Sequence, residues 1–173
     1  YKKVLILGTG AIGQALAKRL KAFDVQTLGI NSNGRSVEYF DNTFALDNIK
    51  DVLGHADVVV GALPLNDLTN KLYDKDFFEL MQDQTIFFNV GRGPQVVEAD
   101  LLAALNNNLA FAALDVFNHE PLASDSKLWE QANLVITPHI SSSSILIEAR
   151  TKELIMENLE NYILAKPIKN RII

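Results

Sequence analysis

VLILGTGAIG, residues 4–13, is the stretch of this chain that decides the fold. Its first four residues form a continuous apolar run that stops at Gly8, which is typical of a strand buried in a parallel sheet. From Ala11 to Phe23 the apolar residues recur at helical spacing. A buried strand followed by a glycine-rich turn and a helix predicts an α/β protein.

The rest of the chain repeats this alternation of strands and helices. Further strands are expected at residues 25–30, 57–63, 85–90, 110–117 and 134–137. Helices are expected at residues 46–53, 75–81, 98–105 and 141–165. The alternation predicts a doubly wound parallel sheet of the Rossmann type in a three-layer αβα arrangement. No repeat or linker interrupts it, so residues 1–173 are expected to form one domain.

The composition is that of a globular protein of one domain. The chain has 173 residues, of which 48% are hydrophobic and 21% charged. Its net charge of −5 argues against a nucleic-acid partner, and no apolar run is long enough for a membrane span. The absence of cysteine excludes disulfides and fits a cytoplasmic location. Because the chain starts without Met, directly before a strand, we interpret it as a fragment of a longer protein.

The glycine-rich turn matches the pattern G-x-G-x-x-G, with a strand before it and a helix after it. Gly8 permits the tight turn, Gly10 lets the backbone approach a pyrophosphate, and Gly13 lets the helix pack closely on the sheet. The backbone amides of Ala11 and Ile12 would point at the phosphates. A tight turn with incidental glycines is the alternative, but this context favours a dinucleotide-binding domain.

The end of the second expected strand bears on the choice of cofactor. An NAD site expects an acidic residue there, which binds the ribose hydroxyls, and this chain has the uncharged Asn31. Ser32 and Arg35 follow, and an Arg beside a neutral position can accept a 2′-phosphate. We therefore expect NADP(H) in preference to NAD(H). The alternative is an ordinary polar turn whose Arg35 points into water.

Three downstream segments carry side chains suited to chemistry beside a bound dinucleotide. They are Arg92 in NVGRG, Glu120 in DVFNHEP and His139 in TPH. A guanidinium can hold a carboxylate with two parallel hydrogen bonds, and an imidazole can transfer a proton near neutral pH. A carboxylate can orient that imidazole and hold it protonated. With a dinucleotide, this set predicts the reduction of a 2-keto acid to a 2-hydroxy acid.

In these segments the chain resembles the nucleotide-binding domain of the D-isomer-specific 2-hydroxyacid dehydrogenases. Besides the glycine loop, the matching segments are Leu63-Pro64-Leu65-Asn66-Asp67-Leu68-Thr69, Asn89-Val90-Gly91-Arg92-Gly93, and residues 97–98, 113–122, 137–140 and 158–170. They extend over essentially the whole chain. The resemblance implies that cofactor binding also involves Leu63, Pro64, Thr69, Val90 and Asp115, with Asp115 near the nicotinamide.

The same resemblance implies a role for each candidate catalytic residue. Arg92 would hold the carboxylate and carbonyl of the substrate, and His139 would be the general acid in ketone reduction. Glu120 would pair with His139 and favour its imidazolium form. Hydride would pass between C4 of the nicotinamide and C2 of a small 2-keto or 2-hydroxy acid. Glyoxylate and hydroxypyruvate are candidates, and branched or aromatic keto acids are others.

Two further features of the resembled family lie outside these residues. Its members usually form homodimers through the nucleotide-binding domain. They also have a second, smaller domain, and the substrate binds in the cleft between the two. Because this chain largely lacks the second domain, we expect it to bind nucleotide but to turn over little substrate by itself.

Other functions on the same scaffold remain open. One is a non-catalytic nucleotide-sensing module, like the corepressors that resemble this family. Another is the oxidation of formate or phosphite, although formate enzymes of the family carry Gln where this chain has Glu120. The family commonly has glycines where this chain has Ser141 to Ser144. These serines would either reshape the pocket or cap the expected final helix.

Overall fold

The structure is a computed structural model that describes residues 2–171. The chain divides into two compact units, Tyr1–His139 and Ile140–Ile173. The first unit holds all the strands of the described residues, and the second is built around one long helix. No helix among the described residues is both long and apolar enough to cross a membrane.

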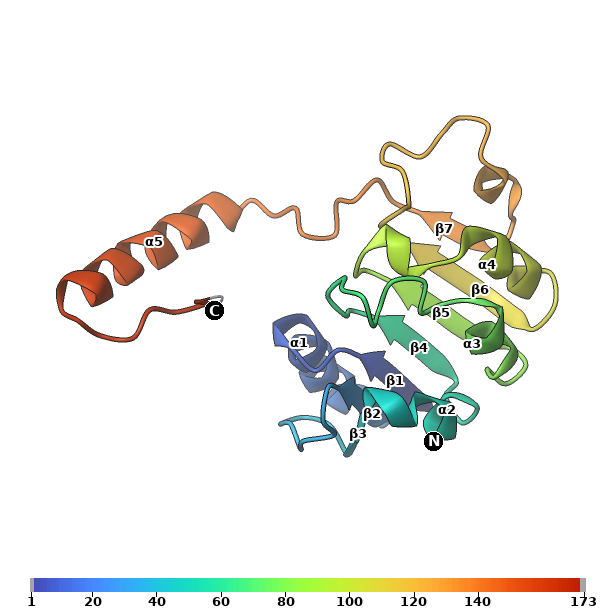
Figure 1. Cartoon of the computed structure of the whole chain (residues 1–173), viewed down its shortest axis with the longest axis horizontal. Coiled ribbons are helices and arrows are strands. Elements are labelled where there is room, and N and C mark those ends of the chain that lie inside the picture. Colours follow the sequence, from blue (N-terminus) through green and yellow to red (C-terminus); the bar gives the residue numbers. More distant parts are fainter. Residues whose placement is uncertain (1, 172–173) are drawn as a thin grey trace. The chain divides into compact units, whose positions relative to one another are not determined.

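The first unit is built on a seven-stranded, wholly parallel sheet with the order β3-β2-β1-β4-β5-β6-β7 (Figure 1). The strands are β1 (Lys3–Leu7), β2 (Gln26–Asn31), β3 (Asn42–Ala45), β4 (Val58–Gly61), β5 (Thr85–Asn89), β6 (Leu109–Leu114) and β7 (Leu134–Ile136). The chain adds β2 and β3 on one side of β1 and the other four strands on the opposite side. This is the doubly wound order, so the predicted fold class is confirmed.

Helices cover both faces of this sheet, as the alternation of side chains along β1 requires. Leu5 and Leu7 join a large buried cluster with residues of three helices on one face. Val4 and Ile6 point the other way and pack with a helix on the opposite face. The first face carries α2 (Ile49–Leu53), α3 (Lys75–Glu79) and α4 (Glu98–Leu105), and the second carries α1 (Ala11–Leu20).

One strand is missing from the sequence prediction, which treats the residues after Asn31 as a polar loop. β3 pairs with β2 in parallel at the edge of the sheet, from Asn42 opposite Leu28 to Ala45 opposite Asn31. Its four residues are exposed or half-buried. An edge strand this short has no continuous apolar run, which is the signal on which a prediction of buried strands depends.

The final helix is shorter than predicted. α5 (Ile147–Ile163) begins six residues after the expected Ser141 and ends two before Ala165. The hydroxyl of Ser144 accepts a hydrogen bond from the backbone N–H of Leu146, and the N-cap Leu146 contributes no side-chain bond. The serines therefore do not cap the helix. Serine favours such local bonds over a helix interior, which explains the late start.

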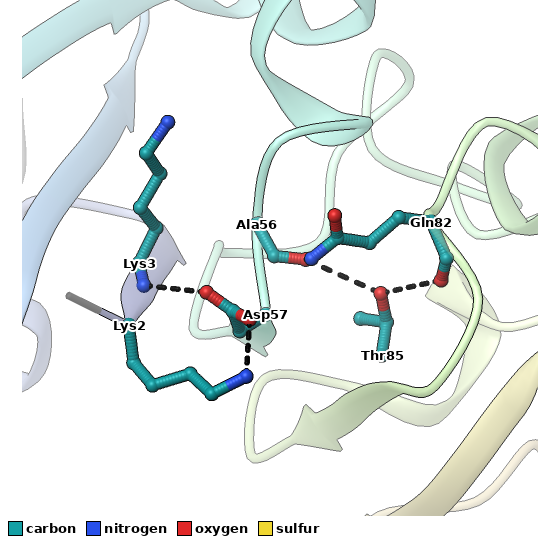
Figure 2. Close-up of polar contacts among 6 residues, drawn as sticks. All are labelled: Lys2, Lys3, Ala56, Asp57, Gln82 and Thr85. Atoms are coloured by element: carbon teal, nitrogen blue, oxygen red, sulfur yellow. Dashed lines mark hydrogen bonds and ion pairs between the residues drawn. The ribbon is translucent and has the colours of Figure 1, made fainter.

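The amino ends of three strands are held together by polar side chains (Figure 2). The carboxylate of Asp57 accepts from the backbone N–H of Lys3 at 2.7 Å and from the ammonium of Lys2 at 2.6 Å. The hydroxyl of Thr85 donates to the carbonyl of Ala56. These bonds join the starts of β1, β4 and β5 across the sheet.

Candidate active site

The candidate residues follow the carboxyl ends of six parallel strands and so lie along one end of the sheet. This end, where the strands finish, is called the carboxyl edge. The glycine turn follows β1, and Asn31 is the last residue of β2. Leu63 follows β4, and the Arg92 segment follows β5. In doubly wound sheets this edge is where ligands bind, at the point where strand order reverses. That point lies here between β1 and β4.

The protein's own structure requires two of the three glycines of the turn, and the third faces open space. Gly8 adopts φ +112°, and a Cβ there would lie 2.6 Å from the carbonyl oxygen of Ala62. A Cβ on Gly13 would lie 1.9 Å from the carbonyl oxygen of Gly8, so the start of α1 needs glycine to pack on the turn. A Cβ on Gly10 would meet nothing within 4 Å. The protein does not itself require Gly10, and the open space beside it fits a ligand that approaches the backbone closely.

The start of α1 is suited to an anion. Gly10 is its N-cap, with no side-chain cap, and the first turn holds no acidic residue. The basic residues Lys18 and Arg19 are in the last turn, where they compensate the negative end of the helix dipole. Exposed Ala11 and Ile12 open the helix. A pyrophosphate placed there would meet free backbone amides at a positive helix end.

A cleft of about 430 Å³ lies beside the glycine turn, and most of the predicted cofactor residues line it. They are Gly8, Gly10, Asn31, Ser32, Arg35, Leu63, Pro64 and Thr69. The lining does not include Ala11, Ile12, Gly13, Val90 or Asp115. It does include residues that the sequence prediction missed, namely Thr9, Leu46, Asp47, Ala62, Asn66 and Leu68. Leu46 and Asp47 were missed because they directly follow β3, the strand that the prediction lacks.

The side chain of Asn31 builds the loop that follows it. Its amide group donates to the carbonyl of Arg35 at 2.9 Å and to the hydroxyl of Thr9 at 3.3 Å. Its carbonyl oxygen accepts from the backbone N–H of Asn33. Asn31 is buried, and these bonds tie the Arg35 loop to the glycine turn. Asn31 therefore shapes the wall of the cleft and brings no charge to it.

The cleft carries charges of both signs. Arg35 and Asp47 both line it, and both are exposed. A guanidinium attracts a phosphate, whereas a carboxylate repels a phosphate and can accept from a hydroxyl or amino group. The cleft thus offers a place for an anionic group and a separate acceptor for a neutral polar one.

Glu120 and His139 form the closest pair of candidate catalytic side chains. Oε2 of Glu120 lies 2.7 Å from Nδ1 of His139, and Oε1 accepts from the backbone N–H of Phe117. The hydrogen bond from His139, and next the one from Phe117, hold the pKa of Glu120 below its usual value. The carboxylate is therefore ionised near neutral pH, where it can orient the imidazole through this hydrogen bond.

His139 is presented by an uncommon backbone conformation. Its φ is +55°, in the left-handed region, and its N–H donates to the carbonyl of Thr137 two residues earlier. Non-glycine residues adopt this region rarely, with histidine among those that tolerate it better. Thr137 still bonds to the carbonyl of Leu114 in β6, and the turn that follows presents the imidazole beside Glu120.

Asp115 links the ends of β6 and β7. Its carboxylate accepts from the hydroxyl of Thr137 at 2.5 Å, and its backbone N–H donates to the carbonyl of Asn89. Asp115 is buried. It also lies close enough to Glu120 for its charge to oppose the fall in the pKa of that residue. Asp115 thus lies between the His139 turn and the end of β5.

Arg92 lies in the loop after β5, and its exposed side chain donates to the carbonyl of Gly91 at 2.7 Å. Its backbone N–H donates to the carboxamide of the buried Gln95. Sequence reasoning missed Gln95, because its other partners, the carbonyls of Leu63 and Pro64, belong to a loop more than 30 residues earlier in the chain. The structure therefore brings Glu120 and His139 together and leaves Arg92 on a neighbouring loop of the same edge.

A second hollow of about 380 Å³ adjoins the acid–base pair. Apart from Glu120 and His139, its walls are apolar. They are formed by Phe117, Pro121, Leu122, Trp129, Ile136 and Pro138. Arg92 is not among the lining residues. An apolar wall lowers the local dielectric constant and so strengthens the interaction within the pair.

Comparison with known proteins gives a consistent result. The family model described as "D-isomer specific 2-hydroxyacid dehydrogenase, NAD binding domain" matches residues 1–141. The chain is 37% identical over 172 residues to glyoxylate/hydroxypyruvate reductase B of Salmonella paratyphi B, covering 98% of this chain and 53% of that protein. The chain thus spans about half the length of the curated relatives it matches.

Two solved structures that cover 99% of this chain, and 55% of their own chains, share its fold. A probable 2-hydroxyacid dehydrogenase from Rhizobium etli, in complex with NADP, HEPES and L(+)-tartaric acid, is 31% identical with a TM-score of 0.91. An NADPH-dependent glyoxylate/hydroxypyruvate reductase from Sinorhizobium meliloti, in complex with NADP and sulfate, is 29% identical with a TM-score of 0.90. By its family model, its relatives and its fold, this chain belongs to the D-isomer-specific 2-hydroxyacid dehydrogenase family.

Proposed function

We propose that the natural protein containing these 173 residues is an NAD(P)H-dependent reductase of small 2-keto acids. The observation that carries the proposal is the 2.7 Å pair of Glu120 and His139, at the same sheet edge as the nucleotide cleft. An acid–base pair beside a dinucleotide site is the equipment that ketone reduction needs. The Salmonella and Sinorhizobium relatives are glyoxylate/hydroxypyruvate reductases by name, which makes those two acids the first substrates to test.

The roles in the reaction follow from the chemistry of the three side chains. The guanidinium of Arg92 binds the carboxylate of the substrate and orients its carbonyl. Glu120 holds Nδ1 of His139, so Nε2 is the ring nitrogen that delivers a proton to the carbonyl oxygen. The bound nicotinamide supplies the hydride that reduces C2. Asp115 borders the site that we assign to the nicotinamide carboxamide.

We assign NADP(H) as the preferred cofactor. The cleft wall at the end of β2 is uncharged at Asn31 and has Arg35 beside it, which suits a 2′-phosphate. The Rhizobium and Sinorhizobium structures are complexes with NADP, which supports the same choice. A homodimer and a cytoplasmic location are further parts of the proposal, and they rest on the resemblance to the family.

The proposal predicts the effect of His139→Ala in the natural protein. Loss of a general acid should lower kcat for glyoxylate or hydroxypyruvate by roughly 10²- to 10⁴-fold. His55→Ala is the matched control, because His55 is an exposed histidine in the loop before β4, away from the carboxyl edge. Steady-state kinetics of both variants checks the prediction. A change of only a few-fold for His139→Ala would remove this residue from the mechanism.

The second candidate is a nucleotide-sensing module without catalysis. The intact Glu120–His139 hydrogen bond argues against it, because a sensor needs no acid–base pair. The two functions separate in one experiment on the natural protein. A sensor binds NADPH and reduces none of a panel of 2-keto acids, whereas a reductase oxidises NADPH when one of them is added.

A further inference from the structure

Gln95 is an unusual residue for its place in the fold. It ends a short 3₁₀ helix, Gly93–Gln95, in the loop after β5, and its side chain is fully buried. Burying a carboxamide costs free energy unless its polar atoms are hydrogen-bonded. The hydrogen-bond partners of Gln95 therefore indicate its structural role.

All the partners of this carboxamide are backbone groups of the candidate site. Its Oε1 accepts from the N–H of Arg92 at 2.9 Å. Its Nε2 donates to the carbonyls of Leu63 and Pro64, at 3.3 Å each. Leu63 and Pro64 line the nucleotide cleft. Gln95 thus bridges the loop after β4, which lines the cleft, and the loop after β5, which carries Arg92.

The surrounding residues are shaped for this bridge. A Cβ on Gly91 would lie 2.5 Å from Oε1 of Gln95 and 2.9 Å from the carbonyl oxygen of Leu63. The glycine before Arg92 therefore leaves the space through which the carboxamide reaches both loops. The backbone of Gln95 is held as well, since its carbonyl accepts from the N–H of Tyr73 and its N–H donates to the carbonyl of Arg92.

We propose that Gln95 is a positioning residue that fixes the Arg92 segment to the Leu63–Pro64 wall, and so sets the substrate-binding arginine relative to the bound nucleotide. The inference rests on the proposed function for the role of Arg92. A buried apolar side chain would fill the same volume and leave the Arg92 N–H without this acceptor. The backbone bonds of Lys71 to Pro94 and of Tyr73 to Gln95 would remain. The Arg92 end of the loop would lose its side-chain link to the Leu63–Pro64 wall, and its guanidinium would shift relative to the cofactor.

The test compares Gln95→Leu with Asn108→Leu. Asn108 is a matched control because it is also a buried carboxamide that donates to two backbone carbonyls, those of Phe78 and Met81. It lies just before β6, at the opposite end of the sheet from Arg92. Both changes remove the same kind of bond, so both should lower the midpoint of urea unfolding. Should Gln95→Leu not fold, Gln95→Met, which matches Gln in length and flexibility, serves instead.

In the natural protein, Gln95→Leu should raise KM for the 2-keto acid by about fivefold or more while kcat changes less than about threefold, because ground-state binding of the carboxylate is lost. Asn108→Leu should leave both constants within about twofold of wild type. If Gln95→Leu destabilises the protein as Asn108→Leu does and leaves KM unchanged, Gln95 is only structural and the inference is overturned.

A second readout does not depend on catalysis. In the 173-residue chain, NADPH should slow hydrogen exchange at the backbone amide of Arg92, because the bridge transmits the ordering of the cleft wall. Gln95→Leu should abolish this slowing and Asn108→Leu should keep it. Equal slowing in wild type and Gln95→Leu, or none in wild type, would overturn the inference. If the natural protein reduces no 2-keto acid, the proposed function fails. The hydrogen-exchange data then test by themselves whether Gln95 couples the Arg92 segment to the cleft wall.

Discussion

At the scale of single residues, Gly10 and Gly13 belong to one motif, but glycine is suited to the two positions for different reasons. Gly13 is required by the protein's own packing, whereas Gly10 faces open space. The motif alone does not distinguish these two reasons. Alanine substitutions at the two positions distinguish them, because the added methyl group meets a different environment at each one.

Gly13→Ala should lower the free energy of unfolding by about 2 kcal/mol or more, since its Cβ would collide with the Gly8 carbonyl and the backbone must shift. Gly10→Ala should cost less than about 1 kcal/mol, the usual difference at an N-cap. It should still weaken NADPH binding, because the methyl group occupies the space proposed for the pyrophosphate. Urea unfolding and calorimetric titration measure the two effects. A stability loss of equal size in both variants would contradict this assignment.

Arg35 is the residue on which the proposed preference for NADP(H) depends. Arg35→Ala should weaken NADPH binding about tenfold or more, as expected for a hydrogen bond to a charged group, and leave NADH binding nearly unchanged. Arg19→Ala is the control, since its guanidinium donates to the carbonyl of Ala15 within α1. Calorimetric titration with both nucleotides gives the answer. Equal losses for NADPH and NADH would show that Arg35 does not contact a 2′-phosphate.

At the scale of elements, the site depends on loops that are joined across neighbouring strands. Gln95 connects the loops after β4 and β5, and Thr137 connects the ends of β6 and β7 through Asp115. A Cβ on Gly93 would lie 1.9 Å from the backbone of Phe117, so the loop after β5 also packs directly on the one after β6. The parallel strands bring these loops to one edge, and the side chains then hold them together.

At the scale of the whole molecule, three carboxylates make stability depend on pH. Hydrogen bonds from Lys21, Lys2 and His139 are the main causes that lower the pKa values of Asp41, Asp57 and Glu120, respectively. A carboxylate with a lowered folded pKa stabilises the fold above its unfolded pKa, and this stability is lost as pH falls through the folded pKa. Because all three are partly exposed, each contributes at most about 1 kcal/mol.

We therefore expect the free energy of unfolding to be nearly constant from pH 7 to about pH 5 and to fall steadily toward pH 2. Urea unfolding at a series of pH values measures it. Asp57→Asn should reduce the size of this fall, while Asp67→Asn, at an exposed position, should leave it as in wild type. A pH profile that Asp57→Asn does not alter would show that the contacts of Figure 2 carry no pH-dependent stability.

The class of the fold and most of its elements could be predicted from the sequence because their signals are local. Apolar runs such as Val58–Val60 and the glycine turn are each complete within a few residues. The errors have local causes too. The edge strand Asn42–Ala45 has no apolar run, and the hydroxyl of Ser144, just before α5, accepts from the N–H of Leu146 in place of a helical bond.

The sequence by itself determined the doubly wound fold, the family, and the residue types of the candidate site, because each of these is encoded by short patterns in a fixed order. Only the tertiary structure decided which side chains meet. It paired Glu120 with His139, assigned Asn31 to loop building, and revealed Gln95 between two loops. Such contacts join residues that are as many as 32 positions apart in the chain, as Gln95 and Leu63 are. They exist only once the parallel strands have brought their carboxyl ends to one edge.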